Sequence, residues 1–166
     1  MCGIVGLFLK DASLEISLGN LLSEMLVTMT DRGPDSAGIA IYAQKESGRS
    51  KFTIQSDDSG HAFNDLHKEL TKSLGCKVNV QVNNTHAVVT LDEGATNKFP
   101  EALKSINPQI RIMSLGSSLE IYKEVGLPKN VIQRFNISKM SGRHGIGHTR
   151  MATESAVTTM GAHPFN

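Results

Sequence analysis

The stretch Cys2-Gly-Ile-Val-Gly-Leu-Phe-Leu9 decides how the fold begins. It is a short apolar run rich in branched and aromatic side chains and ends at Lys10-Asp11, a pattern that predicts a buried strand. Residues 17–29 then repeat leucine and methionine at the i, i+3, i+4, i+7 spacing of one helical face. A loop that contains glycine and proline leads to residues 37–43, which predict a second buried strand. The chain therefore begins as strand, helix, loop and strand.

The middle of the chain, residues 50–116, has a different rhythm. Its periodicity predicts a strand at 51–56, a helix at 61–74, strands at 78–82 and 85–91, a helix at 99–106 and a strand at 109–115. Gly75 is expected to cap the first of these helices, and Asn83-Asn84 to form the turn of a hairpin. The order β-α-β-β-α-β is that of the ferredoxin-like split unit, so we expect a small insert over residues 50–116. Further along, Pro128 is expected in the first turn of a short helix.

Composition limits the class of protein. The 166 residues fit one domain of ordinary size, and 39% hydrophobic with 20% charged residues is typical of folded globular proteins. The formal net charge of +1 provides no basic field for nucleic acid or anionic lipid. Two cysteines are too few for a disulfide framework, and the first apolar run is too short to span a bilayer. We expect a cytoplasmic protein that binds neither nucleic acid nor membrane.

Cys2 has the position that most favours covalent chemistry. If the initiator Met1 is removed, Cys2 carries a thiol and a free α-amine on one residue. An unperturbed α-amine titrates at about pH 7.7 to 8.0 and a thiol at about 8.5, so the amine can act as the base for its own nucleophile. The alternative is a cysteine that packs as a small hydrophobic side chain, and on position alone this alternative is the commoner one.

Three separated motifs follow one another along the chain: Met1-Cys-Gly-Ile-Val-Gly6, Asp31-Arg-Gly-Pro-Asp-Ser-Ala-Gly38 and Gly147-His-Thr-Arg-Met-Ala-Thr153. In these motifs the chain resembles the class II glutamine amidotransferases, a branch of the N-terminal nucleophile hydrolases. The closest similarity is to the amidotransferase subunit of N-methylglutamate synthase and of glutamate-synthase-like systems. The resemblance implies an α+β fold, the four-layer αββα sandwich, over residues 1–166, interrupted by the ferredoxin-like insert.

The resemblance implies a role for each matching residue. Cys2 would attack the side-chain carboxamide of glutamine, release ammonia and form a γ-glutamyl thioester that water hydrolyses to glutamate. Arg150 would bind the α-carboxylate of glutamine, which a planar guanidinium fits well, and Thr153 would help at the same end of the substrate. Arg32 is expected beside the nucleophile in a supporting role. His148 and His163 are motif positions with structural or supporting roles.

Glutamine hydrolysis of this kind implies a partner. Ammonia needs a sheltered path, so an ammonia-accepting synthase subunit or domain is expected, with glutamate or N-methylglutamate as candidate products and a hetero- or homo-oligomer as the assembly. One rival is a catalytically inactive regulatory or assembly subunit that keeps the amidotransferase fold. A second rival concerns the insert alone, which would bind a small effector or a partner in a regulatory role. The more ordinary expectation is that the insert has no function of its own or serves as a docking surface for a partner.

Two departures from the family pattern matter. The family places a His-Asn-Gly segment downstream for the oxyanion and a later aspartate for the substrate amino group, and this chain ends at Asn166 before either. The resemblance therefore predicts a domain truncated at its C-terminus, or one part of a split site, because a single oxyanion-hole donor contributes roughly 2.7 to 4 kcal/mol to such catalysis. Glu154 and Met151 also replace a histidine and an aromatic residue that are common in the family, which changes the expected shape of the glutamine pocket.

No cofactor or metal is expected. The four histidines outside the motifs lack metal-ligand spacing with cysteines or carboxylates; they are His61, His67, His86 and His144. The glycines of residues 142–147 lack the lysine ending or the spacing of a nucleotide-binding loop.

Overall fold

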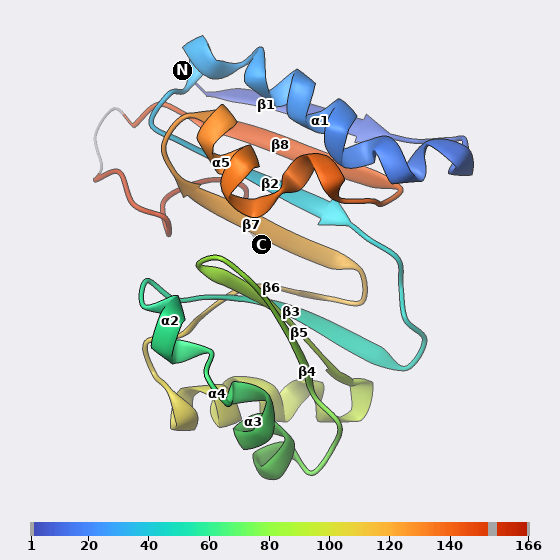
Figure 1. Cartoon of the computed structure of the whole chain (residues 1–166), viewed down its shortest axis with the longest axis vertical. Coiled ribbons are helices and arrows are strands. Elements are labelled where there is room, and N and C mark those ends of the chain that lie inside the picture. Colours follow the sequence, from blue (N-terminus) through green and yellow to red (C-terminus); the bar gives the residue numbers. More distant parts are fainter. Residues whose placement is uncertain (1, 153–155, 166) are drawn as a thin grey trace. The chain divides into compact units, whose positions relative to one another are not determined.

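The computed structural model describes residues 2–152 and 156–165, which form two compact units (Figure 1). The first unit comprises Met1–Gln44 and Ile121–Phe165, and the second comprises Lys45–Glu120. The chain is mixed α+β and contains two antiparallel sheets of four strands, an architecture compatible with an α+β sandwich. Within the described residues, no helix combines the length and apolarity that crossing a membrane requires.

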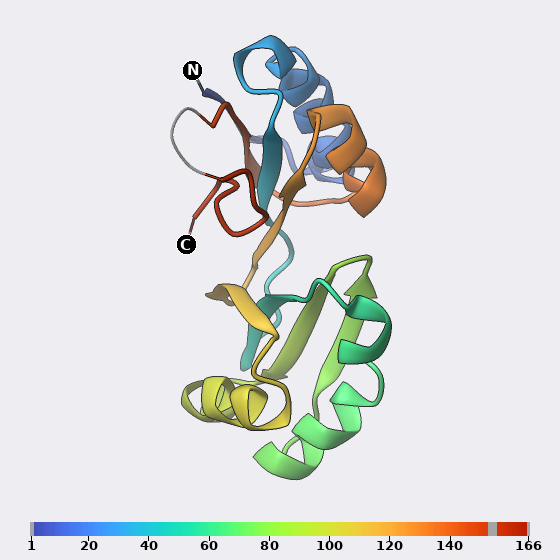
Figure 2. The same cartoon turned by 90° about the vertical axis from the view of Figure 1, so that its left-hand side faces the viewer.

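The first unit is a four-stranded sheet with helices on one face. The strand order is β1 (Gly3–Phe8), β8 (His144–Arg150), β2 (Ser36–Tyr42) and β7 (Leu119–Val125). Its helices are α1 (Leu18–Val27), α5 (Pro128–Phe135) and the short 3₁₀ helices Ala12–Ser17, Thr30–Arg32 and Ile137–Lys139. Figures 1 and 2 show α1 and α5 together on one side of this sheet.

The packing of α1 explains the glycines of β8. The leucines of α1 that the sequence places on one face, Leu18, Leu22 and Leu26, are fully buried. A Cβ atom at Gly147 would lie 2.9 Å from a side-chain methyl carbon of Val5 and 3.0 Å from one of Leu26. The missing side chain therefore allows α1 to approach the sheet, and the predicted helix over residues 17–29 is confirmed, although α1 ends at Val27.

The opposite face of this sheet carries exposed apolar side chains. Burial alternates along β1, and Ile4 and Phe8 are 66% and 56% exposed. Ile146 of β8, opposite Gly6 in the register, is 40% exposed. The strand predicted at residues 2–9 is confirmed as β1, but it is covered on one face rather than on both, because only the side chains facing α1 are buried. A short run of branched residues cannot distinguish the two cases by composition.

The second unit is a sheet with the order β4-β5-β3-β6. Its strands are β3 (Arg49–Gln55), β4 (Asn79–Asn83), β5 (His86–Asp92) and β6 (Arg111–Gly116). Its helices are α2 (Ser59–Ala62), α3 (Leu66–Leu74), α4 (Phe99–Ile106) and the 3₁₀ helix Glu93–Lys98. Strand, helices, strand, strand, helix and strand follow in the order of the split βαββαβ unit.

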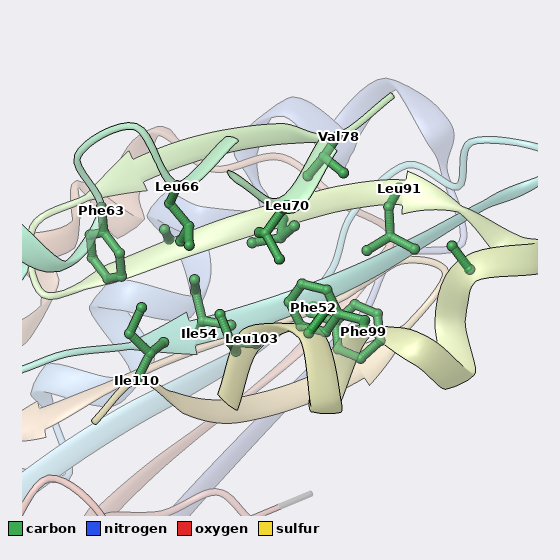
Figure 3. Packing of buried hydrophobic residues seen from close by; sticks show 14 residues of the cluster. Phe52, Ile54, Phe63, Leu66, Leu70, Val78, Leu91, Phe99, Leu103 and Ile110 are labelled. Atoms are coloured by element: carbon green, nitrogen blue, oxygen red, sulfur yellow. The ribbon is translucent and has the colours of Figure 1, made fainter. Parts of the chain in front are cut away.

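A continuous apolar core fills the second unit (Figure 3). At its centre the rings of Phe52 and Phe99 are 4.1 Å apart between centroids, and both side chains are buried. Leu66 and Leu70 of α3 enter the same cluster together with Phe63. These side chains come from helix positions three and four residues apart and from alternate strand positions, as amphipathic elements require.

Two differences from the predicted elements have local causes. The helix predicted at 61–74 is two helices, because Asp65 adopts a left-handed backbone conformation with φ 54° between α2 and α3. Strand β7 was not predicted, since its sequence Leu-Glu-Ile-Tyr-Lys-Glu-Val mixes charged residues into a strand that is mostly buried. The Gly75 cap, with φ 67°, and the Asn83-Asn84 turn, with φ 58° at Asn84, are confirmed.

Candidate functional site

Two of the three sequence motifs meet at the end of β8. Pro34 forms a parallel bridge with Arg150, and the backbone N–H of Asp35 donates to the Arg150 carbonyl at 3.1 Å. The Asp35 carboxylate accepts the backbone N–H of Ala152 at 2.8 Å. A Cβ atom at Gly33 would lie 2.6 Å from the backbone nitrogen of Arg150, so only glycine allows the loop to approach β8 this closely. The 31–38 motif therefore fixes the backbone on both sides of Arg150.

The first motif joins the same end through Cys2 and its neighbours. In the register of the sheet Ile4 lies opposite His148, and side chains of opposite residues share a face. His148 and Arg150 consequently project from the face opposite α1. Cys2 is exposed, and its sulfur lies within 4.8 Å of ring nitrogens of His148 and His163.

The remaining predicted site residues have different positions. Arg32 has an exposed side chain and lies in the 3₁₀ helix Thr30–Arg32. Its backbone N–H donates to the Met29 carbonyl at 3.0 Å, and the Thr149 hydroxyl donates to the same oxygen at 3.2 Å. The turn that carries Arg32 is thus attached to β8. Thr153 lies outside the described residues.

His163 reaches the site because the 156–165 segment lies on the sheet face opposite the helices (Figure 2). Lys123 of β7 is buried, and its ammonium donates to the carbonyls of Ala162 at 2.9 Å and Met160 at 3.3 Å. A Cβ atom at Gly38 would lie 2.2 Å from the His163 carbonyl oxygen. The buried ammonium and the bare backbone of β2 therefore hold the segment against the sheet.

Sequence reasoning missed Lys123 and the structural role of Asp35. Lys123 stands in the strand that was not predicted, and a single lysine in a charged stretch gives no sign that it will be buried. Asp35 and Gly38 lie in the 31–38 motif, but the motif does not predict which backbone atoms these residues contact. Each role depends on a segment more than 35 residues distant in sequence.

Burial controls the charge of the site. Burial, and then the nearby His163, lower the pKa of His148 to about 4. Burial, and then the positive charges of Arg150 and Lys123, lower the pKa of His163 as well. Burial also lowers the pKa of Lys123 to about 8. At neutral pH both imidazoles are therefore uncharged, while Arg150 provides a fixed positive charge close by.

The second unit has a polar cavity of its own. Its volume is about 590 Å³, and Ser56, Asp57, Asp58, Pro108, Gln109 and Arg111 line it. The Arg111 guanidinium donates to Gln55 and to Asp57 at 3.1 Å each, and the Gln55 amide donates to Asp57 at 2.8 Å. These three side chains form a convergent polar set that was not evident in the sequence. They satisfy one another, so the cavity by itself does not indicate a ligand.

Two known proteins match this chain over all or nearly all of its length. Over all of its length the chain is 58% identical to the glutamine amidotransferase-like protein GlxB of Rhizobium meliloti (strain 1021), of which it covers 55%. A putative glutamine amidotransferase of Methanothermobacter thermautotrophicus is 32% identical over 99% of this chain, which covers 56% of that protein. No family model matches the chain.

The chain spans about half the length of the amidotransferase relatives that it matches. Both names refer to glutamine amidotransferases. The alignment with GlxB includes the whole chain and therefore every residue of the site described above.

Proposed function

We propose that this chain carries the glutaminase half-reaction of a class II glutamine amidotransferase, with Cys2 as an N-terminal nucleophile. The observation that carries the proposal is the meeting of two sequence motifs around Arg150, on the strand whose His148 lies beside Cys2. The amidotransferase names of the two relatives support the same reaction class.

The bond changes of this reaction use the thiol and the α-amine of Cys2 and one water molecule. Once Met1 is removed, the α-amine takes the thiol proton, and the sulfur attacks the carboxamide carbon of glutamine. The carbon–nitrogen bond then breaks, the amine returns the proton to the leaving nitrogen, and ammonia departs. Water attacks the remaining γ-glutamyl thioester, so the carbon–sulfur bond breaks and glutamate and the free thiol are formed. The neutral imidazoles of His148 and His163 leave the proton transfers to the amine, because a pKa of about 4 makes His148 a weak base.

Arg150 is the proposed anchor for the substrate. A guanidinium donates two parallel hydrogen bonds to the oxygens of a carboxylate and therefore suits the α-carboxylate of glutamine. The loop of Gly33, Pro34 and Asp35 fixes the backbone that carries this side chain, which would limit the orientations of the bound substrate. Thr153 is proposed to help at the same end, and Arg32 to support the turn beside the nucleophile.

The exposed apolar face of the first sheet fits the proposed fold. In the four-layer αββα sandwich of N-terminal nucleophile hydrolases a second sheet covers this face. Ile4, Phe8 and Ile146 are large apolar side chains that such a layer would remove from water. The second unit, which contains the expected insert of residues 50–116, has its own core and is proposed to interrupt the amidotransferase domain.

Ammonia is proposed to pass to a partner synthase that forms glutamate or N-methylglutamate. Ammonia released into water would be diluted and protonated, so a partner subunit or domain must receive it near Cys2. A test of this part measures glutamine-dependent product formation after the candidate synthase is added to the purified protein.

The nucleophile is tested by glutamate release from glutamine with the natural full-length protein and with Cys2→Ala. We expect loss of release in Cys2→Ala and unchanged release in Cys76→Ala, because Cys76 is in the second unit. Arg150→Lys should raise KM far more than it lowers kcat if the guanidinium binds the α-carboxylate. Equal rates for the natural protein and Cys2→Ala would reject Cys2 as the nucleophile.

A labelling experiment on the same protein distinguishes the enzyme from its rival, an inactive regulatory or assembly subunit. A glutamine-like diazo ketone forms a covalent adduct with a competent nucleophile, and mass spectrometry locates it. An adduct on Cys2 supports the enzyme, whereas a folded protein with intact N-terminal processing and no adduct favours the inactive subunit.

A further inference from the structure

Three side chains from distant parts of the sequence converge on the open sheet face. They are Cys2 before β1, His148 on β8 and His163 in the 156–165 segment. Each supplies one possible metal-ligand atom, a sulfur or a ring nitrogen, and these atoms all lie within 4.8 Å of one another. The proposed glutaminase reaction uses the sulfur of Cys2 and gives neither imidazole a chemical step.

The distances approach those of a zinc site. A tetrahedral Zn²⁺ ion with bonds of about 2.0 to 2.3 Å holds its ligand atoms about 3.3 to 3.6 Å apart. Nδ1 of His163 is 3.1 Å from Nδ1 and 3.3 Å from Nε2 of His148. The two imidazole nitrogens therefore already have nearly the required separation, and the exposed Cys2 sulfur lies within 4.8 Å of both.

The types of ligand atom also suit a metal. Imidazole nitrogens and a cysteine sulfur are usual ligands of Zn²⁺ in proteins. The positive charges of Arg150 and Lys123 act on His163 and oppose a bare cation. A thiolate ligand reduces the charge of the bound zinc by one, so the sulfur is essential for binding.

We propose that Cys2, His148 and His163 bind one Zn²⁺ ion through a sulfur and two imidazole nitrogens, with a fourth position left to water. On binding, the Cys2 thiol releases its proton to solvent, a sulfur–zinc bond forms and the ion loses water molecules. The site does not depend on the proposed glutaminase reaction or on removal of Met1, because all three ligands are side chains. It would, however, withdraw the same sulfur from any substrate.

Zinc binding is tested by competition with a chromophoric chelator. We expect the natural protein to bind one equivalent of Zn²⁺. Cys2→Ser and His163→Ala should bind it at least about tenfold more weakly, since even residues that only hydrogen-bond to metal ligands change metal affinity by about 10- to 100-fold. The matched controls are Cys76→Ser and His67→Ala, which alter a cysteine and an exposed histidine of the second unit and should bind as the natural protein does. Mg²⁺ should not compete, because it prefers oxygen ligands.

Two further measurements guard against misfolded variants. Co²⁺ bound to the natural protein should give a sulfur-to-metal charge-transfer absorption, retained in Cys76→Ser and absent in Cys2→Ser. Zn²⁺ should also slow alkylation of Cys2 by iodoacetamide in the natural protein, with no slowing at Cys76. Failure of the natural protein to bind Zn²⁺, or equal affinities for Cys2→Ser and Cys76→Ser, would overturn the proposal. Either result leaves the glutaminase test unaffected, because that test measures glutamate release in metal-free buffer.

Discussion

The two units of this protein use a four-stranded sheet in different ways. The second unit covers one face of its sheet with helices around a continuous apolar core, and the rings of Phe52 and Phe99 meet at its centre. The first unit also has helices on one face, but its other face carries Cys2, His148 and Arg150 near exposed apolar side chains. Similar four-stranded sheets therefore support a packed core in one unit and carry a candidate site in the other.

What holds the two regions together also differs. The core of the second unit depends on apolar area removed from water, which is not directional. The candidate site depends on a few directional contacts, such as the Lys123 ammonium on two carbonyls and the Asp35 carboxylate on a backbone N–H. We therefore expect large stability effects in the second unit and smaller, local effects in the site.

The largest expected effect comes from Phe99→Ala. Phe99 is completely buried, so truncation leaves a cavity and should lower the free energy of unfolding of the second unit by about 3 to 5 kcal/mol. Denaturant titration, with hydrogen exchange at amides of residues 45–120, measures this loss. The control is Val82→Ala on β4, whose side chain is 56% exposed and whose effect should stay within about 0.5 kcal/mol. Similar losses for the two variants would contradict a core centred on Phe99.

An intermediate effect is expected from Gly38→Ala. The new Cβ would lie 2.2 Å from the His163 carbonyl oxygen and 2.6 Å from Cβ of Lys123, so the 156–165 segment must shift at a cost of about 1 to 3 kcal/mol. Hydrogen exchange in that segment should increase. Gly6→Ala on β1 is the matched control, because no atom lies within 4 Å of its new Cβ. That variant should be neutral or slightly stabilising, and faster exchange of the segment in Gly6→Ala would refute the explanation.

The smallest effect is a pH dependence from Lys123. Its pKa falls from 10.5 to about 8 on folding, because burial disfavours the ammonium. Between about pH 8 and 10.5 the unfolded chain binds more protons than the folded one, so the free energy of unfolding rises with pH. Below pH 8 the penalty for a buried charge is fully present. Lys123→Met should lack this rise, which urea titrations at pH 7.5 and 9.5 compare. Parallel pH profiles for both proteins would show that the ammonium is not desolvated.

The elements of the second unit could be predicted closely, and those of the site less so. Alternating valines, the Gly75 cap and the Asn83-Asn84 turn are local signals, and each lies within the segment that it organises. The break at Asp65 was missed because the helical spacing of apolar residues continues across it. Apolar residues on both sides of the break pack in the same core. Strand β7 was missed because its Lys123 becomes buried only through carbonyls of the 156–165 segment.

The helical and strand periods, many apolar residues of each core and the three motifs with Cys2, Arg32 and Arg150 follow from the amino-acid sequence. These properties depend on neighbours along the chain and on the side chains themselves. Long-range packing instead sets which face of β1 is covered, fixes the Arg150 backbone against the loop of Asp35, and brings His163 to His148 and Cys2. Those outcomes depend on strand register and on contacts between residues more than 100 positions apart, which local periodicity does not encode.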